Sequence, residues 1–309
     1  EYPLDTLIAK RTSGLMRPEH AEKIASITRK QFPEGIQGFG TDALRYTFYS
    51  LASTGRDIKF DLGRMEGYRN FCNKLWNAAR FTLMNCKDHY DSKAARQFNV
   101  ADKWIQSRLQ QVISSVSHSI ETYRFDHVSE TLYDFVWNEY CDWYLELSKP
   151  VIWDNEISAE LKNGTQFTLL SILETSLRLL HPLIPFITEE IWQNVAPMLN
   201  KKGKSIMLAE WPLPDLKAQD LQAEDSIEWL KGVITGIRTI RSEAALPLSK
   251  PLSLILRHSS DQDAKELNQH FFLIKKVCKV SDIRRIDSGE KAPAAFSAMS
   301  GTLELLVPM

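Results

Sequence analysis

The stretch that decides the fold is Arg64 to Phe81, RMEGYRNFCNKLWNAARF. With about 100° between successive residues of an α-helix, its side chains divide into two faces. One face is mainly apolar and comprises Tyr68, Phe71, Cys72, Leu75, Trp76 and Ala79. The opposite face is polar and comprises Arg69, Asn70, Asn73, Lys74, Asn77 and Arg80. The pattern predicts an amphipathic helix whose apolar face packs into a helical core.

The polar face is unusual in its residue types. A plain solvated face favours Glu and Lys, whereas this one carries three asparagines, which are mediocre helix formers. Amide and guanidinium groups are the donors and acceptors that contact base edges and phosphates. Phe81 lies outside the apolar face, beside Lys74 and Asn77, where an aromatic ring can stack on an unpaired base. The alternative is a solvated polar face, with Phe81 turned into a neighbouring element.

Two consecutive segments, GTDALRYTFYSLASTGRDIKFD at 40–61 and EGYRNFCNKLWNAARF at 66–81, resemble the valyl-tRNA synthetases, a family of class I aminoacyl-tRNA synthetases. The resemblance extends over nearly all 309 residues and includes HPLIPFITEEIWQNV at 181–195 and IRSEAALPLSKP at 240–251. The part of these enzymes that the sequence resembles is the part where the catalytic region ends and the helical anticodon-binding domain begins. The resemblance therefore implies recognition of the tRNA(Val) anticodon.

The resemblance also implies particular site residues. Those that match the anticodon-facing segment of the family are Lys74, Asn77, Arg80 and Phe81. Phe81 is expected to be the stacking platform and the others the polar contacts. Asn70 and Asn73 are added on helix geometry alone. In the preceding turn, Arg56 either contacts the tRNA backbone or, with Asp57, fixes the junction between domains.

The family's complete enzymes attach valine to tRNA with ATP and Mg²⁺, and a separate domain hydrolyses misacylated threonine. The HIGH and KMSKS signatures of catalysis are missing from the sequence. We therefore expect the catalytic, editing and C-terminal coiled-coil regions to lie outside this piece. We expect it to hold no catalytic residue, metal site or cofactor, and to be inactive alone. The alternative function is a purely structural helical scaffold with no specific RNA affinity.

Composition is that of an ordinary globular protein, with 43% hydrophobic residues, 25% charged residues and a net charge of −1. The charge is uneven along the chain. Residues 64–81 carry a balance of +3, and residues 121–162 carry a balance of −7. A polyanion should approach the first surface and avoid the second. Ordinary variation between solvated faces is the alternative.

The four cysteines, Cys72, Cys86, Cys141 and Cys278, are scattered without CxxC spacing. This spacing argues against a disulfide framework or a zinc site and suits a reducing cytoplasm. No segment approaches the roughly 18 apolar residues needed to span a bilayer. We expect a cytoplasmic monomer that does not contact membranes.

The predicted fold is mainly α: an antiparallel helical bundle followed by a small α+β domain. We expect a tail of the catalytic region at 1–60, the anticodon-binding bundle at 61–215 and the α+β domain at 222–309. Further long helices are predicted at 101–123, 125–147 and 156–180 from their apolar periodicity. Within the predicted helix at 125–147, Glu139, Asp142 and Glu146 are interpreted as structural or solvent-facing carboxylates, because no histidine or second cluster accompanies them.

Overall fold

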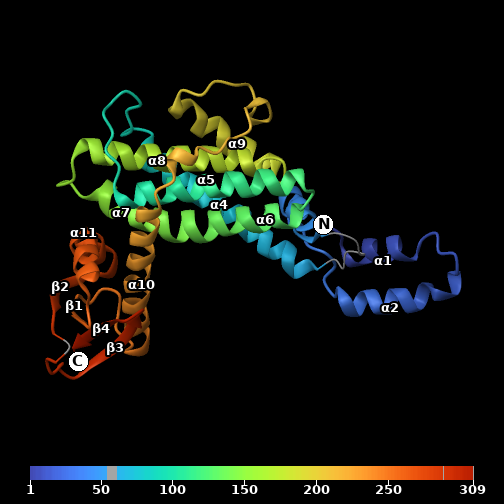
Figure 1. The fold of residues 1–309 in the computed structure, drawn as a ribbon. Helices are drawn as coiled ribbons and strands as arrows, with labels where there is room; N and C mark the ends of the chain where they lie inside the picture. The colour runs from blue at the N-terminus through green and yellow to red at the C-terminus, as the bar shows by residue number, and fades with distance from the viewer. Residues whose placement is uncertain (54–60, 288, 309) are drawn as a thin grey trace.

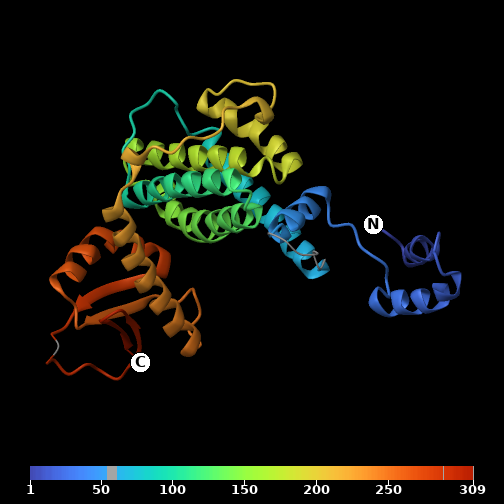
Figure 2. The same cartoon turned by 45° about the vertical axis from the view of Figure 1, so that its right-hand side comes forward.

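The structure is a computed structural model that describes residues 1–53, 61–287 and 289–308 (Figure 1). The predicted fold class is confirmed: a helical bundle is followed by a small α+β unit with a four-stranded sheet. The first part of the chain contains α1 (Leu4–Thr12), α2 (Ala21–Gln31) and α3 (Thr41–Leu51). In both views α1 and α2 stand away from the bundle, whereas α3 lies against it (Figures 1 and 2). The predicted role of Arg56 and Asp57 concerns residues outside the described ranges.

The bundle is built from four long helical runs. They are α4 (Leu62–Cys86), α5 (Val100–Glu121), a continuous run of α6 (Phe125–Asp134), a π-helical segment (Phe135–Tyr144) and α7 (Leu145–Trp153), and finally α8 (Ala159–Leu180). The shorter α9 (Pro185–Val195) packs beside α8 and α4. Two long helices begin at side-chain caps that the sequence supplies: Asn99 and Asp102 form a capping box on α5, and Ser158 caps α8.

Side-chain contacts set the helix directions. Lys74 meets Asp142, and Asn85 meets Trp153, so α4 runs parallel to the α6–α7 run. Arg108 of α5 contacts Glu139, and Asp102 of α5 contacts Tyr144. Because the position rises along one helix as it falls along the other, α5 runs antiparallel to the α6–α7 run. Consecutive long helices are therefore antiparallel, as predicted.

The α6–α7 run extends farther than predicted. We expected this helix to end at Leu147, before Pro150, but it continues to Trp153. Proline removes one backbone donor, which usually ends or kinks a helix. Here Leu147 and Val151 on either side of it are both buried, so packing holds the last turns in place.

A glycine in α8 has a packing reason. Gly164 lies where the backbone of the loop between α4 and α5 crosses the helix, and a Cβ at this position would meet the carbonyl oxygen of Gln97 at 1.9 Å. The helix predicted across this residue is confirmed. Glycine is required there by the close approach, despite its poor helix propensity.

A buried polar cluster joins three of the bundle helices. The carboxylate of Asp102 accepts hydrogen bonds from Tyr144 Oη at 2.6 Å, from Thr165 Oγ1 at 3.1 Å and from the Asn99 amide at 3.0 Å. Despite these donors, burial raises the Asp102 pKa to about 7.

The α+β unit follows α10 (Leu221–Glu243). The elements of this unit are β1 (Leu252–Arg257), α11 (Asp261–Cys278), β2 (Val280–Arg285), β3 (Ala295–Ser300) and β4 (Leu303–Pro308). One part of α10 packs on α5, and another part packs on β3 and β4 (Figure 2). The sheet order is β2-β1-β4-β3, with β1 and β2 parallel and the other pairs antiparallel. The α11 helix is the crossover between the parallel strands.

Candidate nucleic-acid interface

The outer face of α4 is a strip of exposed side chains. Its exposed members, spaced three or four residues apart, are Glu66, Asn70, Asn73, Asn77, Arg80 and Met84. Four of the six predicted site residues, Asn70, Asn73, Asn77 and Arg80, thus share one accessible surface. Arg80 forms no ion pair with another described residue. The strip can offer amides and a guanidinium group to a polyanion.

Lys74 lies at the edge of this strip and already has partners. Its Nζ is 2.5 Å from Asp142 Oδ1 and 3.8 Å from the ring centre of Trp137. The carboxylate and the indole hold the ammonium group toward the π-helical segment. A phosphate that binds Lys74 therefore competes with Asp142.

Phe81 lies on the same edge of the strip as Lys74, two helical turns farther along α4, and is half-buried. Its ring meets that of Trp153 edge-on, with centroids 6.2 Å apart, and Lys149 Nζ is 5.7 Å from the Phe81 ring centre. The ring thus packs against α7 and keeps one exposed portion, and its role as a stacking platform stays a prediction.

Trp153 is an accessible aromatic residue that sequence reasoning missed. Its side chain is 60% exposed, and its Nε1 donates a hydrogen bond to Asn85 Oδ1 at 2.8 Å. The bond and the contact with Phe81 fix the indole at the end of the α4 strip. A tryptophan close to the predicted end of a helix was the available signal, but its exposure depends on contacts with α4.

Trp76 was wrongly assigned to the apolar face, since it is 42% exposed. The buried positions of α4 are Met65, Phe71, Leu75, Ala78, Ala79, Thr82 and Cys86. Trp76 lies at the border of this stripe, where the neighbouring helices leave it partly uncovered. It adds a second accessible indole beside the asparagines.

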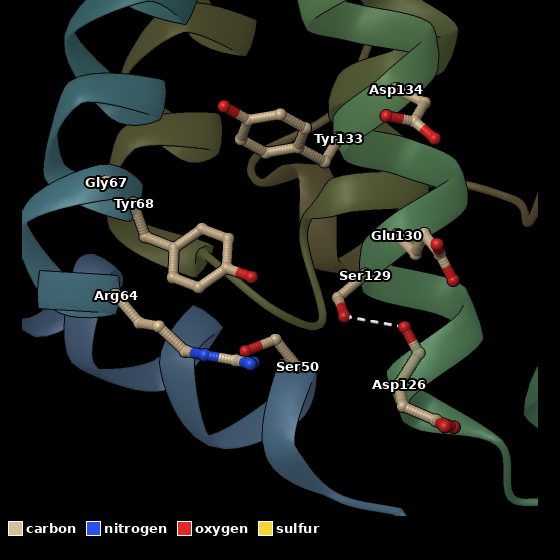
Figure 3. Close-up of a pocket in the computed structure, with 9 residues that line it drawn as sticks. All are labelled: Ser50, Arg64, Gly67, Tyr68, Asp126, Ser129, Glu130, Tyr133 and Asp134. Carbon is tan, nitrogen blue, oxygen red and sulfur yellow. Dashed lines mark hydrogen bonds between the residues drawn. The ribbon is translucent and has the colours of Figure 1, made fainter. Parts of the chain in front are cut away.

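The opposite end of α4 has different chemistry (Figure 3). A pocket of about 510 Å³ lies between α3, α4 and α6, with Arg64 and Tyr68 of α4 facing the acidic residues Asp126, Glu130 and Asp134 of α6. Arg124 hydrogen-bonds to Asp126 and lowers the pKa of this carboxyl to about 2. This acidic wall disfavours phosphate. The surroundings of α4 are therefore acidic at its Arg64 end and aromatic at its Phe81 end.

Comparison with known proteins places the fold in a family. Residues 102–256 match the model of the anticodon-binding domain of tRNA ligase, which is half of the chain. The chain belongs to the family of tRNA-ligase anticodon-binding domains. The matched segment of this family runs from α5 to β1, so α4 precedes it.

Full-length relatives do include α4. The chain is 48% identical over 308 residues to the valine–tRNA ligase of Acinetobacter baylyi, and 48% identical over 308 residues to that of Legionella pneumophila strain Lens. It is 46% identical over 307 residues to the valine–tRNA ligase of Coxiella burnetii. Each alignment covers 99% of this chain but only 32–33% of the relative, so the chain spans about a third of their length.

A solved structure, the ternary complex of Agrobacterium radiobacter K84 agnB2 LeuRS with tRNA and LeuAMS, aligns with a TM-score of 0.39 and 13% identity. The alignment covers 82% of this chain and 29% of the LeuRS chain. We draw no conclusion from a likeness at this level.

In the described ranges, no three His, Cys, Asp or Glu side chains gather as metal ligands, and the four cysteines are unpaired. None of the helices described has the length and apolar character needed to cross a membrane. The candidate site described here is the α4 strip with its flanking aromatic residues.

Proposed function

We propose that this chain recognises the anticodon of tRNA(Val) as part of a valine–tRNA ligase. The observation that carries the proposal is the exposed strip of asparagines and Arg80 on α4, in a chain of the anticodon-binding family. The anticodon loop is single-stranded, so its bases can be splayed out and contacted individually. The relatives with 46–48% identity bear the name valine–tRNA ligase, which supports valine as the amino acid.

Each part of the surface has a separate role in this proposal. The exposed portion of Phe81 stacks on a base, and the amides of Asn70, Asn73 and Asn77 exchange hydrogen bonds with base edges. Arg80 and Lys74 neutralise phosphates, Lys74 after it leaves Asp142. The acidic pocket at the Arg64 end keeps the RNA toward the Trp153 end.

The whole protein, in this proposal, attaches valine to tRNA using ATP and Mg²⁺. The described residues offer no grouped metal ligands, so ATP and Mg²⁺ are assigned to the part of the relatives that this chain does not span. We further propose that the protein is a cytoplasmic monomer. Its division into a catalytic tail at 1–60, a tRNA-binding bundle at 61–215 and an α+β domain at 222–309 belongs to the same proposal.

Binding measurements test the anticodon function directly. The chain is titrated with tRNA(Val) and with a tRNA(Val) transcript altered at the middle and third anticodon bases, at low and at moderate salt. We expect weak binding that falls with salt, because phosphate contacts release counterions, and a preference for the native anticodon at both salts. Equal binding of both transcripts would contradict anticodon recognition and favour the structural scaffold.

A further inference from the structure

A cleft continues from the α4 strip toward the α+β unit. It lies between α7 on one side and α10 and α11 on the other, and its volume is about 560 Å³. Lys149, Pro150 and Trp153 line it from α7, while Arg238 and Lys276 line it from α10 and α11. Trp153 therefore belongs both to this cleft and to the end of the α4 strip, where it touches Phe81.

The indole of Trp153 is presented in a fixed orientation. The ring is 60% exposed, yet its N–H is held by Asn85 and one side rests against Phe81. An exposed ring that is already ordered loses little conformational entropy when a base stacks on it. These are the properties of a stacking platform in single-strand binding proteins.

Three cations and three acidic residues line the cleft around this platform. Arg238 is exposed and forms no ion pair among the described residues, and its guanidinium lies 5.3 Å from the ring centre of Trp143. Lys149 pairs with Glu146 at 2.5 Å, and Lys276 pairs with Asp154 at 2.7 Å. Glu156 also lines the cleft. Arg238 can thus bind a phosphate without giving up a carboxylate partner, whereas Lys149 and Lys276 must each exchange a carboxylate for the phosphate.

We propose that a nucleotide of the RNA strand bound along α4 continues into this cleft. Its base stacks on Trp153 and its phosphate contacts Arg238, so the α+β unit becomes part of the RNA-binding surface. The inference rests on the proposed function, since it assumes that RNA occupies the α4 strip. It adds a second stacking position and a contribution from α10.

Variants of the chain separate these contributions. Trp153→Leu should weaken binding of tRNA(Val) by about 5- to 100-fold, because stacking on an aromatic side chain is lost. Trp153→Phe should recover most of this affinity, since a ring remains. Arg238→Ala should weaken binding and reduce the salt dependence by about one counterion. Phe186→Leu is the matched control, because Phe186 is 65% exposed on α9, away from α11 in both views (Figures 1 and 2).

Photo-crosslinking gives an independent readout. Anticodon-loop transcripts with 4-thiouridine should crosslink to peptides containing Trp153 and Arg238 as well as to α4. If Trp153→Leu binds like the unaltered chain and crosslinks stay on α4, the cleft proposal is overturned while anticodon recognition stands. If Phe81→Ala and Trp153→Leu both leave binding unchanged and the altered anticodon binds equally, the proposed function fails as well.

Discussion

At the scale of single residues, the α4 surface combines free groups with engaged ones. Asn73, Asn77 and Arg80 are exposed, whereas Lys74 is bound to Asp142 and Phe81 is partly covered by α7. The engaged residues link RNA binding to local packing. Their variants should therefore change affinity and stability in different proportions.

Phe81→Ala should weaken RNA binding by about 1–3 kcal/mol through the lost stacking contact. It should also lower the free energy of unfolding by about 1 kcal/mol, because the edge-on contact with Trp153 is lost. Titration with tRNA(Val) and urea unfolding measure the two effects, with Phe186→Ala as the control. A large loss of stability with unchanged binding would identify Phe81 as a packing residue only.

Asp142→Asn should strengthen RNA binding by about two- to fivefold, because it releases Lys74 and removes a negative charge beside the strip. The free energy of unfolding should change by less than about 1 kcal/mol, since Lys74 and Asp142 are 24% and 49% exposed. Tight-binding titrations at low salt would detect the change. The control is Glu210→Gln, which removes an exposed acid from a loop and should not strengthen RNA binding. Weaker RNA binding by Asp142→Asn would show that the ion pair itself positions Lys74 for RNA.

At the scale of elements, the sequence predicted the long helices of the bundle but not the contacts between them. Periodicity is local, so α4, α5 and α8 were predicted from their own residues. The contacts of Lys74 with Asp142 and of Trp153 with Asn85 each join residues 68 positions apart. No local pattern shows that one cation is already paired or that one indole is exposed. Consequently the asparagine face was predictable, while Trp153 and the outward position of Trp76 were not.

The buried Asp102 cluster should make the stability of the bundle depend on pH. Burial raises the folded-state pKa of Asp102 to about 7 from an ordinary value of 3.8. Its contribution to stability is therefore fully present below about pH 3.8 and is lost as pH rises through about 7. In urea unfolding, the free energy of unfolding of the unaltered chain should fall relative to that of Asp102→Asn as the pH rises from 5 to 8. A difference that stays constant over this range would mean that the three hydrogen-bond donors keep Asp102 ionised.

At the scale of the whole molecule, α10 connects the bundle to the sheet. The close contact depends on Gly236, where a Cβ would meet Leu305 Cδ1 at 2.4 Å. A second connection lies near the start of α10, where Ser226 Oγ hydrogen-bonds to Glu266 and lies 2.7 Å from His270 Nε2 of α11. Ser226 and Glu266 share a small cavity with Val100 and Lys103 of α5. This buried cluster therefore joins α10 to α11, next to a cavity that α5 also lines.

The His270 cluster should weaken on acidification. Burial lowers the pKa of His270 from its ordinary value of 6.5, although Glu266 opposes the shift. Neutral His270 stabilises the fold above about pH 6.5, and this contribution is lost as pH falls through the lower folded-state pKa. Hydrogen exchange of α11 amides, corrected for intrinsic rates, should therefore accelerate between pH 7.5 and 5.5. Amides of α8 serve as the internal reference, and His270→Gln should remove the effect; its persistence in this variant would assign the acid sensitivity to another group.

The π-helical segment has a consequence for insertions and deletions. Val128 and Leu147 both face the core and lie nineteen positions apart, whereas five full α-helical turns advance the chain by about eighteen positions. The wider turns of Phe135–Tyr144 absorb the surplus residue, so both ends of the run stay in phase with α4 and α5. Loss of one residue here would restore a regular α-helix and keep Trp153 beside Phe81. Gain of one residue would rotate the end of α7 out of the core, so the length of this helix tolerates change in only one direction.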